Sequence, residues 1–72
     1  MITLSQIRLR LIKSIKESGL SQTEIANKLN ISVSAISHML KGDIMPALDT
    51  LANICQILDL DTDYILCQDI KD

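Results

Sequence analysis

The stretch SQTEIANKLNISVSAISHMLKG, residues 21–42, places the strongest constraint on the fold of this chain, because it encodes two short helices joined by a tight turn. Ser21 and Glu24 have the spacing of a capping box, which begins the first helix. Asn30 accepts the positive φ of a helix end, and Ser32 can cap a second helix that ends at the glycine closing the stretch. Two helices connected in this way have to cross at close range.

The close crossing of these two helices restricts which residue types can occupy several positions of residues 21–42. The first helix needs a small residue where the two helices touch, and Ala26 meets that need. Apolar residues must anchor both helices to a core, and five positions do so: Ile25, Leu29, Ile31, Ile36 and Met39. Together with Asn30 in the turn, these positions satisfy their demands at the spacing of a helix-turn-helix.

Helix signals also lie on both sides of this unit. Thr3 and Gln6 form another capping box, and the helix that they begin runs to about Ser18 and ends at Gly19 in a left-handed conformation. Pro46 stands at or just before the first turn of a fourth helix. The apolar residues of that helix repeat at helical spacing: Leu48, Leu51, Ala52, Cys55 and Leu58.

A last short helix begins at Asp61, which can cap it, and runs to about Cys67. The sequence shows neither strict alternation nor Gly-Asn turns, so it predicts an all-α fold of five helices in one domain, residues 1–72. The core of such a fold is aliphatic, since the chain holds twelve Ile and eleven Leu but no Phe or Trp.

Composition argues against several other classes of protein. The two cysteines cannot form a disulfide framework, and two Cys and one His do not occur at the spacing of metal ligands. The N-terminus lacks the unbroken apolar run of a signal peptide, and no run approaches the roughly 18 residues of a membrane span. We therefore expect a cytoplasmic chain with no membrane association, no metal, no cofactor and no small-molecule ligand.

Charge divides unevenly along the chain, although the net charge is only −2. Residues 1–41 hold six Lys or Arg against two Glu, a net of +4, whereas residues 42–72 hold one Lys against seven Asp, a net of −6. A polyanion would approach the first half and be repelled by the second.

Residues 7–66 resemble the Cro/CI-type (lambda-repressor-like, XRE) helix-turn-helix family. LSQTEIANKLNIS is similar to the first half of its motif, with the turn Leu-Gly-Val-Ser written here as Leu29-Asn30-Ile31-Ser32. MPALDTLANICQILDLDTDYIL is similar to its last two helices. The resemblance implies a five-helix DNA-binding domain that regulates transcription in the cytoplasm, usually as a dimer on paired half-sites.

The resemblance also assigns a DNA-binding surface. Gln22 matches a glutamine that contacts phosphate and buttresses the recognition helix, and Lys41 with the amides near Gly42 and Asp43 matches a loop that grips backbone phosphate. Four residues match positions that face base edges: Val33, Ser34, Ser37 and His38. The predicted DNA-binding set is Gln22, Ser32, Val33, Ser34, Ser37, His38 and Lys41.

Base reading by these side chains is expected to be modest, because a hydroxyl can donate or accept and so discriminates poorly. Val33 either contacts a thymine methyl or fills space near the sugar. Phosphate potential would favour protonated His38, so we hypothesise that binding tightens as the pH falls through its titration. Arg8 and Arg10 are better candidates for phosphate contact than Lys13, Lys16 and Lys28.

Three departures from the family pattern stand out. Asn30 replaces the glycine of the turn, and Asp59 replaces the glycine that usually ends the fourth helix; both are tolerable in a left-handed conformation. The family commonly pairs an Arg late in the first helix with a Glu late in the recognition helix, where this chain has Ile15 and Leu40. Replacing both partners of a buried ion pair is often neutral. We therefore predict that Ile15 and Leu40 touch.

The last helix carries apolar residues on more than one side, which suggests a partner surface. We predict a homodimer through this helix and the C-terminal residues: Tyr64, Ile65, Cys67 and Ile70. The alternative for Ile70 is a frayed tail. A two-fold dimer would set its recognition helices about 34 Å apart.

The sequence thus predicts a small regulator that binds double-stranded DNA sequence-specifically, in the manner of a Cro-like repressor. The alternative is a protein-interaction module or antitoxin-like partner with weak DNA binding, which the scarcity of polar residues in the recognition helix favours. The two differ in salt dependence, which is steep for phosphate contacts. An enzyme is not indicated, since the single His lacks a positioned Cys or Ser partner and no Gly-rich loop is present.

Overall fold

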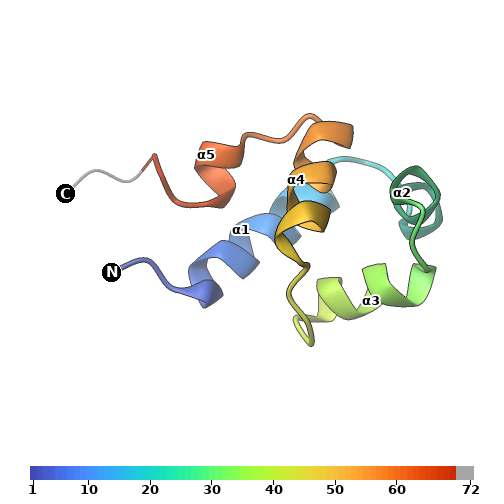
Figure 1. Cartoon of the computed structure of the whole chain (residues 1–72), viewed down its shortest axis with the longest axis horizontal. Helices are drawn as coiled ribbons and strands as arrows, with labels where there is room; N and C mark the ends of the chain where they lie inside the picture. Colours follow the sequence, from blue (N-terminus) through green and yellow to red (C-terminus); the bar gives the residue numbers. More distant parts are fainter. Residues whose placement is uncertain (70–72) are drawn as a thin grey trace.

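A computed structural model describes residues 1–69 of the chain, and this part is built from helices without strands. The helices are α1 (Leu4–Glu17), α2 (Gln22–Leu29), α3 (Val33–Lys41), α4 (Leu48–Ile57) and α5 (Thr62–Ile65). Figure 1 shows α2 and α3 at one end of the molecule, with the N-terminus and α5 toward the other. The predicted five-helix, all-α fold is confirmed. No helix within residues 1–69 is long and apolar enough to cross a membrane.

Side-chain caps begin four of the five helices. Thr3 and Gln6 form both bonds of the predicted capping box on α1, since the Thr3 Oγ1 accepts from the Gln6 amide (3.2 Å) and the Gln6 Oε1 accepts from the Thr3 amide (2.8 Å). Ser21 and Glu24 form the second box, on α2. Such a cap stabilises a helix by about 1 kcal/mol. α4 begins after Ala47 without a side-chain cap.

The ends of α2, α3, α4 and α5 share one hydrogen-bonded turn, the Schellman motif, each built on a left-handed residue. These residues are Asn30 (φ 56°), Gly42 (φ 83°), Asp59 (φ 54°) and Cys67 (φ 61°). In each turn the amide of that residue and the amide after it both donate back to carbonyls of the helix. The left-handed conformations expected at Asn30 and at Gly19, after α1, are confirmed.

One apolar core joins all five helices. Its buried members are Leu11, Ile15, Ile25, Ala26, Ile36, Met39, Leu51, Ile54, Cys55 and Ile65. The anchors predicted for the α2–α3 unit are all in or against this core, with Leu29 and Ile31 half-buried at its edge. Leu40 packs against the same cluster that contains Ile15, so both replacements of the family's ion pair lie in one apolar region. Their direct contact stays a prediction.

α5 is shorter than the sequence predicted, because it ends at Ile65 rather than near Cys67. Asp61 caps it as expected, its Oδ1 accepting from the amides of Asp63 (3.0 Å) and Tyr64 (3.3 Å). The left-handed conformation of Cys67 is the physical reason for the early end, since it turns the chain out of the helical path.

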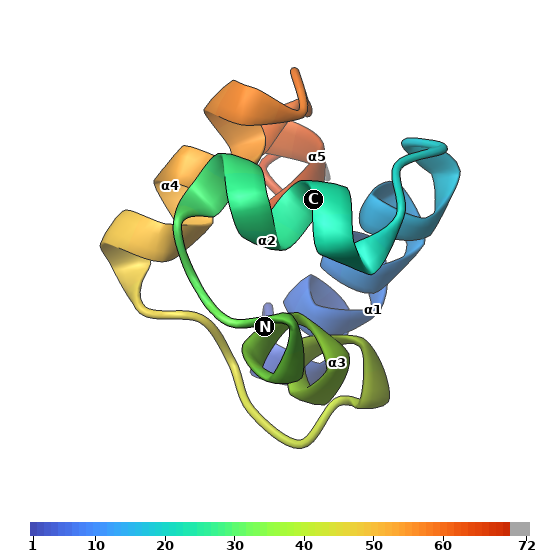
Figure 2. The ribbon, with the colours of Figure 1, turned by 90° about the vertical axis from the view of Figure 1, so that its right-hand side faces the viewer.

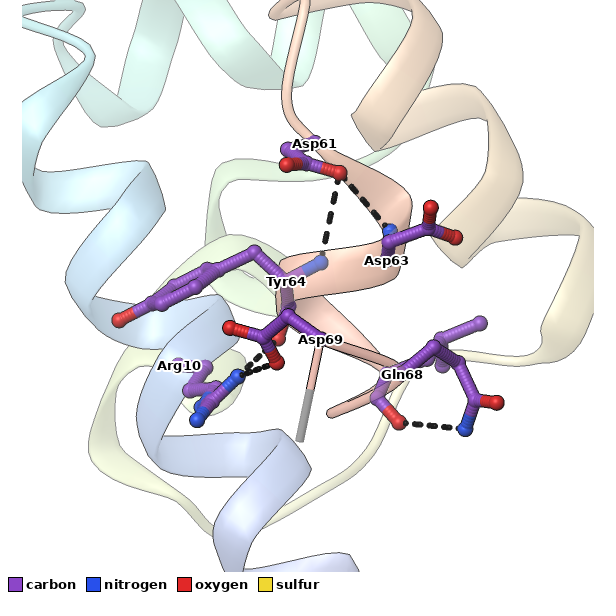
Figure 3. A network of polar contacts seen from close by, with 7 residues as sticks. Arg10, Asp61, Asp63, Tyr64, Gln68 and Asp69 are labelled. Carbon is purple, nitrogen blue, oxygen red and sulfur yellow. Dashed lines mark hydrogen bonds and ion pairs between the residues drawn. The ribbon is translucent and has the colours of Figure 1, made fainter. Parts of the chain in front are cut away.

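Arg10 of α1 fastens this short helix to the rest of the molecule, as Figure 3 shows. Its Nη1 donates to the carbonyl of Tyr64 (2.8 Å) and to the carboxylate of Asp69 (2.6 Å). Its guanidinium also lies over the Tyr64 ring, 4.5 Å from the centroid. The hydrogen bond that Arg10 donates to Asp69 raises the pKa of Arg10 above its ordinary value, so the guanidinium keeps its positive charge in this contact.

Candidate nucleic-acid interface

α3 presents two chemically different sides. Ile36 and Met39 are buried in the core. Helical periodicity places the predicted reading residues together on the opposite side: Val33, Ser34, Ser37, His38 and Lys41. All of these are exposed except Ser37, which is half-buried, and Val33 is 43% exposed. Figure 2 shows α3 at the surface of the molecule, crossing α2. The structure therefore brings these five predicted site residues into one exposed stripe.

The other two predicted site residues lie at helix starts. The Ser32 Oγ accepts from the Ala35 amide (3.1 Å), so it caps α3, and this bond leaves the hydroxyl proton free to be donated. Gln22 is the first residue of α2 and is exposed. The start of a helix also carries unpaired amides and a positive dipole end, which favour phosphate nearby.

The C-terminal end of α3 differs from the expectation. The amide of Gly42 donates to the Met39 carbonyl (3.1 Å) and that of Asp43 to the His38 carbonyl (3.0 Å). Phosphate contact by Lys41 and by other amides near these two stays a prediction, but the amides of Gly42 and Asp43 themselves already donate within the helix end. A sequence signal for this existed: glycine after a helix predicts the Schellman motif, which uses these two donors.

Side chains at this end carry mixed charge. The Nδ1 of His38 lies 3.2 Å from the Oδ2 of Asp43, and both side chains are about half exposed. Lys41 is exposed next to them. Arg8 reaches the same corner from α1: a Cβ built on Gly42 would lie 3.4 Å from the Arg8 Cδ. The corner thus combines two permanent cations, one carboxylate and one histidine.

The two arginines that sequence reasoning treated alike have separate positions. Arg10 binds α5 and Asp69, whereas Arg8 lies under the end of α3. This division had no sequence signal, because it depends on contacts between residues more than thirty positions apart.

The predicted dimer contacts need correction. Ile65 and Cys67 are completely buried in the core of the protein's own fold, so they are unavailable to a partner. Tyr64 is half-buried beneath Arg10, and Ile70 lies outside the described residues. Ile65 is a member of the core cluster that joins the five helices, and Cys67, in the left-handed turn after α5, is covered just as completely.

An apolar groove between α4 and α5 was missed. It has a volume of about 170 Å³ and is lined by Leu48, Leu51, Ala52, Cys55, Thr62 and Leu66. Leu48, at its edge, is 85% exposed, and Leu66 is 37% exposed. Burial raises the pKa of the Cys55 thiol, which keeps this residue in its neutral, unreactive form. The helical spacing of α4 contained Leu48, but spacing alone does not show that the first turn projects past the core.

Comparison with known proteins agrees with the geometry. A family model described as helix-turn-helix matches residues 11–65, from the middle of α1 to the end of α5. No curated protein and no solved structure matches the chain. The matched span covers most of the sequence and includes the whole α2–α3 unit with its exposed stripe. The chain therefore belongs to the Cro/CI-type helix-turn-helix family of DNA-binding transcription regulators.

Proposed function

We propose that this protein is a small, non-catalytic, cytoplasmic repressor that binds a specific double-stranded DNA sequence through α3. The observation that carries the proposal is the exposed stripe of α3, opposite the buried Ile36 and Met39, on a helix braced by α2. A helix presented in this way has the shape that enters the major groove, with its N-terminal residues toward the bases.

Each side chain then has a role that its chemistry allows. Ser34, Ser37 and His38 meet base edges, and Val33 lies near a thymine methyl or the sugar. Gln22, Ser32 and Lys41 contact phosphate at the flanks of the helix. Since hydroxyls discriminate weakly, much of the specificity comes from DNA shape and from the spacing of two half-sites.

We infer that two copies of the protein form a homodimer on those half-sites. Their contact is the α4–α5 groove and not Ile65 and Cys67, which are buried in the core. The groove and the exposed Leu48 at its edge share one face of the molecule. A two-fold axis would therefore let each Leu48 enter the groove of the other copy, the self-complementary arrangement of an isologous interface.

Selection of bound sites from random duplex DNA tests the function directly. A palindromic product with half-sites about 10 base pairs apart is expected for a two-fold dimer. Ser34→Glu should abolish selection, because it places a carboxylate on the exposed stripe. Gln56→Glu adds the same charge at an exposed position of α4, away from the stripe, and should not. No enrichment by the native protein would contradict the proposal.

The dimer is tested on the selected site. Leu48→Glu should leave the fold and single half-site binding intact, because Leu48 is 85% exposed, while it converts a sedimenting dimer to a monomer. Affinity for the paired site should then fall by tenfold or more, as linkage between the two half-sites is lost. A Leu48→Glu protein that remains dimeric would place the interface elsewhere.

A protein-interaction role for the same fold is the second candidate, and the apolar groove beside an acidic second half is the observation that favours it. DNA binding should weaken steeply with salt, with log K falling by about 0.9 per phosphate contact for each unit of log salt. Binding that is absent or flat with salt would support the interaction role instead.

A further inference from the structure

The side chain of Arg8 occupies an unusual position beneath the end of α3. Its Cδ approaches the space beside Gly42, where a Cβ would lie 3.4 Å away, and Figure 2 shows the first turns of α1 behind α3. The Arg8 Nε is buried, yet it has no hydrogen-bond partner within residues 1–69. A buried donor without an acceptor is unfavourable. No hydrogen bond of the Nε therefore holds the Arg8 side chain in this position.

Arg10, two residues later on α1, provides the contrast. It donates to the Tyr64 carbonyl and to the Asp69 carboxylate, and it stacks on the Tyr64 ring. Moving Arg10 toward an anion would break all three interactions. Moving Arg8 breaks no hydrogen bond recorded in residues 1–69 and gives its Nε access to an acceptor. Of the two arginines, Arg8 is the one free to bind an external anion.

The surroundings of Arg8 require a cation there if DNA is to approach. The C-terminal end of a helix carries partial negative charge, and this end adds the carboxylate of Asp43. The amides of Gly42 and Asp43 are occupied, so they cannot offset that charge by donating to a phosphate. Side-chain cations have to do so, and Arg8 and Lys41 are the permanent cations at this corner.

We propose that Arg8 and Lys41 form a binding site for one phosphodiester of the DNA backbone, at the junction of α1 with the end of α3. The site rests on the proposed function, since α3 must lie in the groove for a backbone phosphate to pass this corner. Arg8 rotates outward past Gly42, which has no side chain in the way, and its Nε and Nη groups donate to phosphate oxygens in the bidentate geometry typical of arginine.

The test of this site is the affinity of the full chain for its selected duplex and for random duplex, measured at a series of salt concentrations. Arg8→Ala should weaken both by a similar factor, about tenfold, and lower the salt slope by about 0.9, the value for one phosphate. Arg8→Lys should keep most of the slope. Lys13→Ala removes an exposed charge from the same helix and serves as the matched control, with little change in slope.

Arg8→Gln is a second variant for the case that Arg8→Ala misfolds, since Gln keeps much of the aliphatic stem that packs under Gly42. The thermal unfolding of each variant is compared with that of the native protein. Unchanged affinity and slope in folded Arg8→Ala or Arg8→Gln would overturn the phosphate site while leaving DNA binding by α3 intact. Equal losses of slope in Arg8→Ala and Lys13→Ala would also overturn it, because the effect would then be one of general charge. Absence of salt-dependent binding by the native protein would instead refute the proposed function itself.

Discussion

The ends of α3 and α5 use the same backbone turn for opposite purposes. Gly42 ends α3 without a side chain, which leaves the corner open to solvent and to Arg8. Cys67 ends the turn after α5 in the same left-handed conformation, but its side chain is completely buried and Arg10 fastens the segment to α1. The turn itself therefore does not decide whether a helix end becomes a binding surface or part of the core. The side chain at the left-handed position and the partners of the nearby arginine decide it.

The largest expected effect tests the apolar packing beneath the α3 end. Ile15→Arg should destabilise the fold by about 3–5 kcal/mol, because it buries an unpaired charge at a position that is 2% exposed. Adding Leu40→Glu should recover a large part of this loss by rebuilding the ion pair common in the family. Chemical denaturation of both single variants and the double variant gives the coupling energy. Losses that simply add would show that Ile15 and Leu40 do not touch.

The α5 end should depend on Arg10 in a way that the α3 end does not. Arg10→Ala removes both hydrogen bonds and the ring contact that hold residues 64–69. Amide hydrogen exchange of Cys67 and Gln68 should accelerate by an order of magnitude or more, since local opening there loses its main restraint. Amides of α2 and α3 should exchange as before. Equal acceleration across all helices would mean that Arg10 stabilises the whole fold, and the two ends would not be independent.

The contrast between the ends also explains what the sequence could predict. Caps at Thr3, Ser21, Ser32 and Asp61 and the left-handed Asn30 depend on residues within a few positions of one another, and all were predicted correctly. The exposed stripe of α3 followed from its helical period. Burial of Ile65 and Cys67 and the separate positions of Arg8 and Arg10 were not predictable, because they arise where chain segments distant in sequence meet.

A smaller effect measures the free-energy cost of a left-handed backbone at a residue that has a Cβ, a cost that Gly42 does not have. Asp59, after α4, has φ 54° and is exposed, so few contacts complicate its replacement. Asp59→Gly should stabilise the protein by about 0.5–1 kcal/mol, because glycine adopts this conformation without steric cost. Asp59→Ala should destabilise it, since alanine carries the Cβ but lacks the local hydrogen bonding of Asp. Thermal unfolding measures both. Equal stability of the Gly and Asp forms would show that the left-handed turn carries no strain here.

The smallest effect concerns the titratable pair at the open end, His38 and Asp43, whose Nδ1 and Oδ2 lie 3.2 Å apart. A histidine side chain gains a positive charge on protonation, which a lower pH favours. Protonation places a positive charge beside Asp43 and so lowers the repulsion between this corner and phosphate. DNA affinity should therefore rise by about threefold as the pH falls from 7.5 to 5.5 at fixed ionic strength, a change suited to one partly screened charge. His38 is the only histidine of the chain, so His38→Ala should remove this rise. Identical pH profiles for the two proteins would exclude His38 as its source, and an Asp43→Asn variant with a steeper rise than the native protein would contradict the role given to the carboxylate.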